Sequence, residues 1–187
     1  MSISPLTRKM LTDHIADTTT AHGIGQKTRS LWFSYADFIS DSAGSVTMGS
    51  PPNSVKASAL ADATTSGVLF CFQMPADAVG GAVTIRPVWA PNSTISSSHA
   101  VRWQMNIKLL TSGDVSASGG ETAWTEAVSA WTASYVNKAA GQNSGSVQPA
   151  AGDVVRLNLR RLGSDAADTA TTIVNLIGII IEYVAIR

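Results

Sequence analysis

Apolar and polar residues alternate with a period of two along most of the chain after residue 30. Successive side chains of a β-strand point to opposite faces, so each such segment has one face for a core and one for solvent. Turns rich in Gly, Pro, Ser and Asn separate the segments, which predicts an all-β fold: an antiparallel β-sandwich of jelly-roll type. The segments with the clearest alternation are 31–39, 68–74, 83–89, 101–109 and 155–160.

The last strand, within 172–186, departs from this alternation because both of its faces are apolar. Such a strand lies either at the centre of a sheet covered on both faces or between its own core and another subunit. We favour the second interpretation, since the other strands have one polar face, and it predicts an obligate oligomer. The residues predicted to form the interface between subunits are Ile177, Ile179, Ile181 and Tyr183.

The first thirty residues follow a different pattern, with apolar residues at helical spacing. Ser4 can cap a helix, Pro5 suits its first turn, and Gly23 and Gly25 end the segment. About three turns are marginal for an isolated helix in water, so the segment should become ordered only against a partner. We therefore divide the chain into a short, partly helical N-terminal arm, 1–29, and a β-sandwich domain, 30–187. The apolar positions of the arm are Leu6, Met10, Leu11 and Ile15.

The composition narrows the classes of function. The chain has 187 residues, its formal net charge is zero and only 14% of its residues are charged. A dedicated nucleic-acid-binding protein would carry a basic excess, so we expect no nucleic-acid partner. No apolar run reaches the roughly 18 residues of a membrane span, and residues 1–10 are too polar for a secretory signal. These features predict synthesis in the cytoplasm and no membrane partner. The single cysteine, Cys71, is expected to be a small buried residue.

No constellation of residues predicts catalysis. His14 and His22 lack the spacing of zinc ligands on one helix face. Asp165 and Asp168 lie in a loop rich in Gly, Ser and Ala, where turn formation explains both. Neither paired carboxylates nor a Ser-His-Asp set is recognisable. We therefore expect no enzyme activity, no cofactor and no bound metal.

Two groups of side chains are candidate binding surfaces. If the strands 101–109 and 155–160 are neighbours, their outer faces form a mildly basic patch, which is either a solvated surface or a contact for a partner protein or an acidic glycan. Separately, a tryptophan beside a carboxylate can stack on a sugar, and Glu121 and Glu126 flank Trp124. The alternative for these aromatic residues is packing in the core or between subunits. The basic patch would contain Arg102, Lys108, Arg156 and Arg160, and the sugar-binding residues would be Trp124, Trp131 and Tyr135.

Two parts of the chain resemble surface proteins of tailed bacteriophages. Residues 13–25, DHIADTTTAHGIG, resemble a repeat of tail fibres and other fibrous virion proteins. The remainder resembles a small jelly-roll domain at the C-terminus of many phage fibre, head-fibre and decoration proteins. The matching segments are 70–92, 150–170 (AAGDVVRLNLRRLGSDAADTA) and 175–183 (NLIGIIIEY).

The resemblance implies a homotrimer on the virion surface, attached to the particle by the N-terminal arm, with the last strand at the trimer interface. Because almost no shaft separates the arm from the sandwich, a capsid decoration protein or head fibre fits better than a long tail fibre. Its partners would be capsid proteins, or tail and adaptor proteins. The alternative is a short tail fibre that recognises a host-surface polysaccharide. The residues predicted to dock on the particle are Leu6, Met10, Leu11 and Ile15.

Overall fold

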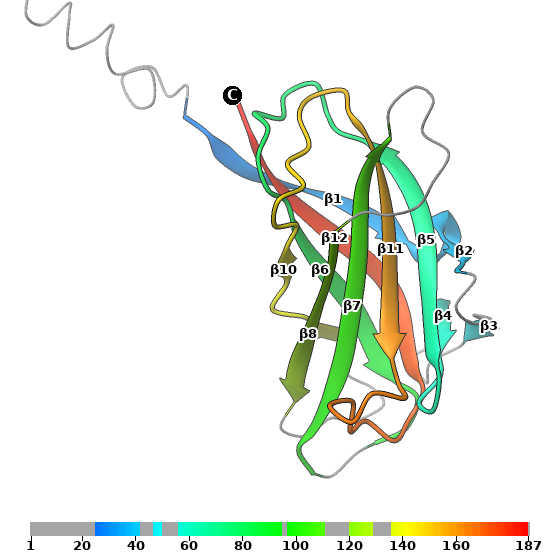
Figure 1. The fold of residues 1–187 in the computed structure, drawn as a ribbon. Coiled ribbons are helices and arrows are strands. Elements are labelled where there is room, and N and C mark those ends of the chain that lie inside the picture. The colour runs from blue at the N-terminus through cyan, green and yellow to red at the C-terminus, as the bar shows by residue number, and fades with distance from the viewer. Residues whose placement is uncertain are drawn as a thin grey trace, which may run out of the picture.

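The computed structural model describes residues 25–41, 47–49, 56–94, 97–110, 120–128 and 136–186. Within these ranges two antiparallel β-sheets pack face to face, and one short 3-10 helix, η1 (Tyr35–Asp37), interrupts them (Figure 1). The predicted all-β sandwich is therefore confirmed. No helix among these residues is long and apolar enough to span a bilayer. The predicted docking residues of the arm, Leu6, Met10, Leu11 and Ile15, lie outside the described residues, as do Trp131 and Tyr135.

The first sheet has seven strands, with the last strand of the chain, β12 (Val174–Ala185), at its centre. One edge of β12 pairs with β6 (Thr84–Pro91), while its other edge is shared by β1 (Lys27–Ser34) and β4 (Ala57–Leu60). The pairing of Lys27 with Ala185 shows that the sandwich already includes the last residues of the predicted arm. The remaining strands are β3 (Thr47–Gly49), β9 (Asn137–Lys138) and β10 (Gln142–Asn143).

The second sheet has five strands in the order β2-β5-β11-β7-β8 and lies in front of β12 in Figure 1. Its long strands carry the alternation that the sequence predicts, and β11 lies between β5 and β7 over almost its whole length. The strands are β2 (Ile39–Ser40), β5 (Thr65–Gln73), β7 (His99–Leu110), β8 (Gly120–Val128) and β11 (Val154–Leu162).

The core between the sheets consists of the apolar residues that alternate along these strands. Complete burial of one such side chain contributes about 1.5–3 kcal/mol, so the core supplies most of the stability. The inward faces expected for 68–74, 83–89, 101–109 and 155–160 are confirmed. Fully buried members include Val101, Trp103, Met105, Val155, Leu157, Leu159, Ile85 and Trp89.

A buried ion pair joins the two sheets. Arg161 occupies the inward position that follows Leu159 on β11, and its side chain is fully buried with Asp168. Its Nε and Nη2 donate to the two carboxylate oxygens of Asp168 at 2.9 and 2.8 Å, and its Nη1 donates to the carbonyl of Leu60 on β4 at 3.3 Å. Asp168 also accepts the backbone N–H of Arg102 at 2.9 Å. The predicted role of Asp168 in the turn is therefore incomplete, because its carboxylate also pairs with the buried Arg161.

Candidate functional site

A β-bulge in β12 decides which of its residues reach the core. The register between β12 and β6 shifts between Leu176 and Gly178, which leaves Ile177 as the extra residue. The side of the strand that faces the core therefore changes from even-numbered to odd-numbered residues at the bulge. Before the bulge, Val174 and Leu176 are buried. The buried core residues after the bulge are Ile179, Ile181, Tyr183 and Ala185.

Three of the four residues predicted at a subunit interface lie in the core of the single chain. Ile179 and Ile181 are fully buried, and the Tyr183 hydroxyl donates to Asp77 at 3.2 Å. Burial and the Asp77 carboxylate raise the pKa of Tyr183. Assigning these three side chains to an intersubunit contact was wrong, because the bulge turns them towards the opposite sheet. Ile177, the fourth, is half-buried.

The opposite side of β12 presents an apolar surface, which we call the β1–β12 face and define by Trp32, Ile180 and Val184. Trp32 on β1 lies directly opposite Ile180, and Val184 follows on the same side of β12. Trp32 is 52% exposed and Val184 37%, while Ile180 is half-buried. Exposed apolar surface gathered around one tryptophan is typical of a site where another molecule binds.

A glycine fixes the position of Trp32. A Cβ atom added at Gly178 would lie 2.3 Å from Cη2 and 2.4 Å from Cζ2 of the indole, and 2.5 Å from the carbonyl oxygen of Phe33. The indole thus lies directly over the backbone of β12. Only glycine at this position allows both the ring and strand β1 to approach so closely.

The carboxylate on this side of the sheet has its partners within the chain. Glu182, next to Ile180 and Val184 in the outward row, forms ion pairs with Arg86 at 2.8 Å and with Lys138 at 3.7 Å. Another molecule that covers the β1–β12 face therefore does not have to supply a partner for an isolated charge.

The aromatic residues near the edge strand β8 pack inwards rather than forming an exposed platform. Trp124 lies opposite Trp103, is half-buried and contacts the hydrophobic core. Two residues later, Oε2 of Glu126 accepts indole N–H groups from Trp103 at 3.0 Å and from Trp89, on the other sheet, at 3.1 Å. Burial raises the pKa of Glu126, and the two indole hydrogen bonds oppose that shift. For Trp124 the structure favours core packing over sugar stacking.

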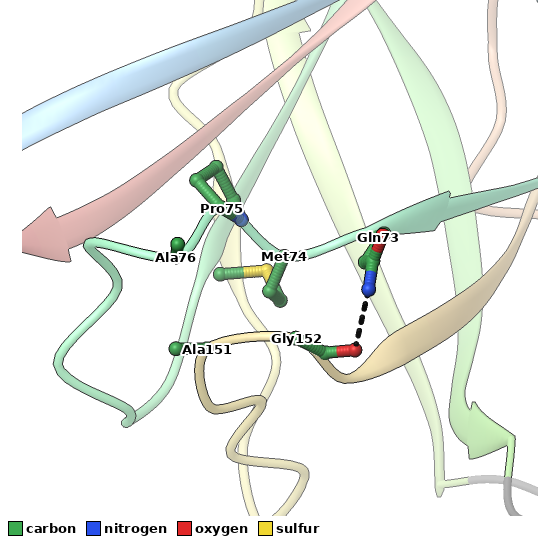
Figure 2. Close-up of a pocket in the computed structure, with 6 residues that line it drawn as sticks. All are labelled: Gln73, Met74, Pro75, Ala76, Ala151 and Gly152. Carbon is green, nitrogen blue, oxygen red and sulfur yellow. Dashed lines mark hydrogen bonds between the residues drawn. The ribbon is translucent and has the colours of Figure 1, made fainter.

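A pocket of about 410 Å³ lies at one end of the sandwich, between the loop after β5 and the turn before β11 (Figure 2). Gln73 crosses it and donates to the carbonyl of Gly152 at 3.0 Å. Its lining contains no acid, base or nucleophile. The lining residues are Gln73, Met74, Pro75, Ala76, Ala151 and Gly152.

The outward rows of β7 and of the middle of β11 are polar, as the sequence predicts, whereas Ile39 on β2 and Val154 at the start of β11 are exposed apolar residues on the same side. Strands β7 and β11 are neighbours, so that Arg156 lies opposite Lys108 and Arg160 opposite Gln104. Arg160 pairs with Asp41. Cys71 lies beside Arg156 on this outer side and is exposed, which corrects the expectation that it is buried. The correction follows from its parity, which is opposite to that of its buried neighbours on β5.

The described residues include no group of three His, Cys, Asp or Glu side chains that could hold a metal ion. His14 and His22 lie outside the described residues. The sequence analysis missed Arg161 and Trp32, and it named Glu126 only as a candidate sugar ligand rather than as a partner of two buried indoles. Arg161 and Glu126 share the inward parity of their strands, and this periodicity could have revealed them.

Comparison with known proteins gives no family assignment. The chain matches no protein-family model, and no curated protein is similar to it. Among solved structures, CBM35 from Cellvibrio japonicus Abf62 is similar, with a TM-score of 0.48 and 13% identity over 82% of this chain and 92% of that one. The CBM36-1 domain of a multidomain xylanase from the hindgut metagenome of Trinervitermes trinervoides gives a TM-score of 0.38 and 12% identity over 82% and 96%. Both scores are too low to support an argument about function.

Proposed function

We propose that this protein is a non-catalytic structural module that assembles into a homotrimer on the surface of a bacteriophage particle. The observation that carries the proposal is the β1–β12 face, an exposed apolar surface on a strand whose other side fills the core. We assign the subunit contact to this face, with Trp32, Ile180 and Val184 in place of Ile179, Ile181 and Tyr183.

The chemistry of the face favours further copies of the same chain over a charged partner. The chain has no net charge. Because Glu182 is already paired with Arg86 and Lys138, copies that meet here bring no unbalanced carboxylate into the contact. Burying apolar side chains stabilises an interface by about 25 cal/mol per Å², and tryptophan is enriched at the centre of interfaces.

The virion location is supported by the resemblance of three sequence segments to fibre and decoration proteins. Two of them, 150–170 and 175–183, coincide with β11, the loop that carries Asp168, and β12. Lys27, within the predicted arm, pairs with Ala185 at the end of β12, beside the proposed subunit contact. Three arms that leave a trimer together bind a particle as one body, so weak individual contacts add through effective concentration.

The alternative, a short tail fibre that recognises a glycan through Trp124, Trp131 and Tyr135, has less support. The side chain of Trp124 packs against the core, and the nearby Glu126 carboxylate accepts two indole N–H groups. A sugar would have to displace these contacts to use either residue.

The subunit contact is tested by Ile180→Asp, with light scattering after size exclusion at micromolar concentration. We expect the unmodified chain to be a trimer and Ile180→Asp to be a folded monomer, since three carboxylates would otherwise be buried. Ile39→Asp is the matched control, because Ile39 is 63% exposed on β2 of the other sheet and should leave the trimer intact. A monomeric unmodified chain, or a trimer of Ile180→Asp, would overturn the assignment.

The role of the arm is tested by comparing residues 25–187 with the full chain in co-sedimentation with phage particles that lack the protein. We expect the shortened chain to stay trimeric and to remain in the supernatant, while the full chain sediments with the particles. Particle binding by the shortened chain would show that the arm is not the attachment device.

A further inference from the structure

Strand β8 forms a long edge of the five-stranded sheet (Figure 1). It pairs with β7 over nine residues without a register shift, and among the described residues no strand pairs with its other side. The free N–H and C=O groups of such an edge can pair with a strand of another chain, so proteins usually keep edge strands short or charged. At the other edges of this sandwich, β2, β3, β9 and β10 have only two or three residues each.

The composition of β8 does not protect its edge. The outer side of β1 is also unpaired within the described residues, but β1 carries Lys27 and Arg29, which discourage the addition of a strand. Strand β8 contains no Lys, Arg or Pro, and the carboxylate of Glu126 on it is turned inwards to two indole N–H groups. A further strand can therefore approach β8 without a steric or charged obstacle. Its outward side chains are small and exposed: Ala123, Thr125 and Ala127.

Two copies of β8 can pair with each other in antiparallel orientation without opposing like charges. When all nine residues overlap, Trp124 of one copy lies opposite Trp124 of the other, on a two-fold axis. Ala123 then lies opposite Thr125 of the second copy, and Glu126 lies opposite Thr122. No glutamate meets another glutamate, and an aromatic pair occupies the centre of the contact, which is a favourable cross-strand arrangement.

The inward rows of the two copies would also become continuous. Trp124 lies opposite Trp103 on β7 and is half-buried at the edge of the sheet. A second Trp124 beside it would cover more of its side chain, and aromatic pairs stabilise a contact beyond the area that they bury. The sequence of β8 therefore favours its own copy as the strand that completes the edge.

We propose that β8 is a second contact between copies of this chain, in which β8 strands of neighbouring trimers pair antiparallel about a two-fold axis. The contact lies on the other sheet from the β1–β12 face, so it goes beyond the proposed trimer and does not depend on it. One ladder of this length falls below the roughly 1,200 Å² of buried surface that stable complexes need, so the copies stay apart at micromolar concentration. Copies held close together on a particle reach millimolar effective concentrations, at which the ladder forms.

Disulfide cross-linking tests the register of the contact. Every sample carries Ile180→Asp, which removes the proposed trimer contact, and Cys71→Ser, because Cys71 is exposed. Proteins with Ala123→Cys and with Thr125→Cys are mixed at about 1 mM under mild oxidation. Residues directly opposite each other have Cα atoms about 4.5–5.5 Å apart, within the range of a disulfide, whereas two copies of one residue lie diagonally at about 7–8 Å. We expect the mixture to cross-link about tenfold faster than either protein alone. The control mixture of Ala123→Cys with Ile39→Cys, at the opposite edge of the sheet, should show no such gain.

Sedimentation equilibrium measures the strength of the contact without cross-linking. The Ile180→Asp protein should be a monomer at micromolar concentration and form dimers as it approaches about 1 mM. Adding Ala123→Lys/Ala127→Lys brings like charges together along the joined edges and should weaken dimerisation about tenfold or more. The control Ile39→Lys/Val154→Lys adds the same charge to exposed positions away from β8 and should change it by less than about twofold.

Three results would overturn the proposal. One is the absence of any association of the Ile180→Asp protein at the highest concentration, which would leave β8 to a different partner. The second is a mixture of cysteine variants that cross-links no faster than the single variants. The third is an equal loss of association in the two lysine variants. Since Ile180 lies on the other sheet, none of these results depends on whether the trimer is assigned correctly.

Discussion

The two outer faces of this sandwich differ although one core lies between them. On the seven-stranded sheet the outward row of β12 presents Ile180 and Val184, Trp32 lies over Gly178 in the same row, and Glu182 between the two apolar residues is paired within the chain. On the five-stranded sheet the outward rows of β7 and β11 are mostly polar, with Arg156 opposite Lys108 and Arg160 paired with Asp41, and the exposed apolar residues Ile39 and Val154 lie towards the periphery of these rows.

Folding requires that the inward sides of the strands be largely apolar, and both sheets meet that requirement apart from Arg161 and Glu126, which have partners in the core. The outward sides are free to vary, so their composition reflects what each face contacts. Exposed apolar side chains around a tryptophan are typical of a surface that another molecule covers, whereas rows of charged and amide side chains are typical of a solvated surface. Substitutions that alter one face and spare the other therefore test whether the two faces have separate roles.

The largest loss of stability is expected from Asp168→Asn. It should affect both faces, because the ion pair that it removes joins the two sheets. Without the carboxylate, the guanidinium of Arg161 is buried without its counter-charge, which costs about 3–5 kcal/mol. For a domain of this size we expect the melting temperature to fall by roughly 10 °C. Asp165→Asn is the matched control in the same loop, since Asp165 lies 4.0 Å from Arg102 and is partly exposed, and its cost should stay below about 1 kcal/mol.

Differential scanning calorimetry of the two variants measures the difference. Equal melting temperatures for Asp168→Asn and Asp165→Asn would mean that the buried pair does not hold the sheets together.

A smaller loss of stability is expected from replacing one glycine on each face by alanine: Gly178 on β12 and Gly67 on β5. A Cβ at Gly178 would meet the Trp32 ring and the Phe33 carbonyl oxygen, and a Cβ at Gly67 would meet Arg160 Cγ and the Leu159 carbonyl oxygen, both at 2.6 Å. Each alanine variant should lose about 1–3 kcal/mol through overpacking. Only Gly178→Ala should also weaken self-association, because it displaces Trp32.

Chemical denaturation and sedimentation velocity together distinguish the two variants. If Gly67→Ala disturbed self-association as much as Gly178→Ala, the distinction between the faces would fail.

The smallest effect on stability concerns the contact that Glu126 on β8 makes with Trp89 on β6 of the other sheet. Because burial raises the pKa of Glu126 above 4.5, its contribution to stability is full below the unfolded-state pKa and is lost as pH rises through the folded-state pKa. Glu126→Gln keeps an oxygen for the two indole N–H groups and removes this loss. The variant should match the unmodified chain near pH 4 and exceed it by up to about 1 kcal/mol at pH 7.

Melting temperatures of both proteins across this pH range isolate Glu126, since every other residue is common to both. A difference that does not grow with pH would show that the Glu126 carboxylate is not held in a desolvated position.

Much of the core could be predicted from the sequence, because strict alternation along 101–109 and 155–160 specifies both the strand and its inward side. The basic patch followed from the same alternation once β7 and β11 were found to be neighbours. The predicted trimer interface failed for Ile179, Ile181 and Tyr183, because a strand that is apolar on both sides gives no information about which side faces the core.

The sequence by itself determined the all-β class, the inward faces of the alternating strands and the apolar character of both sides of the last strand. Local periodicity encodes these features, since they depend only on the pleat of a single strand. The tertiary structure alone decided the side of β12 that meets the core, the burial of Arg161 with Asp168, and the position of Trp32 over Gly178. These depend on a bulge and on contacts between segments distant in the sequence, which no pattern within one strand records.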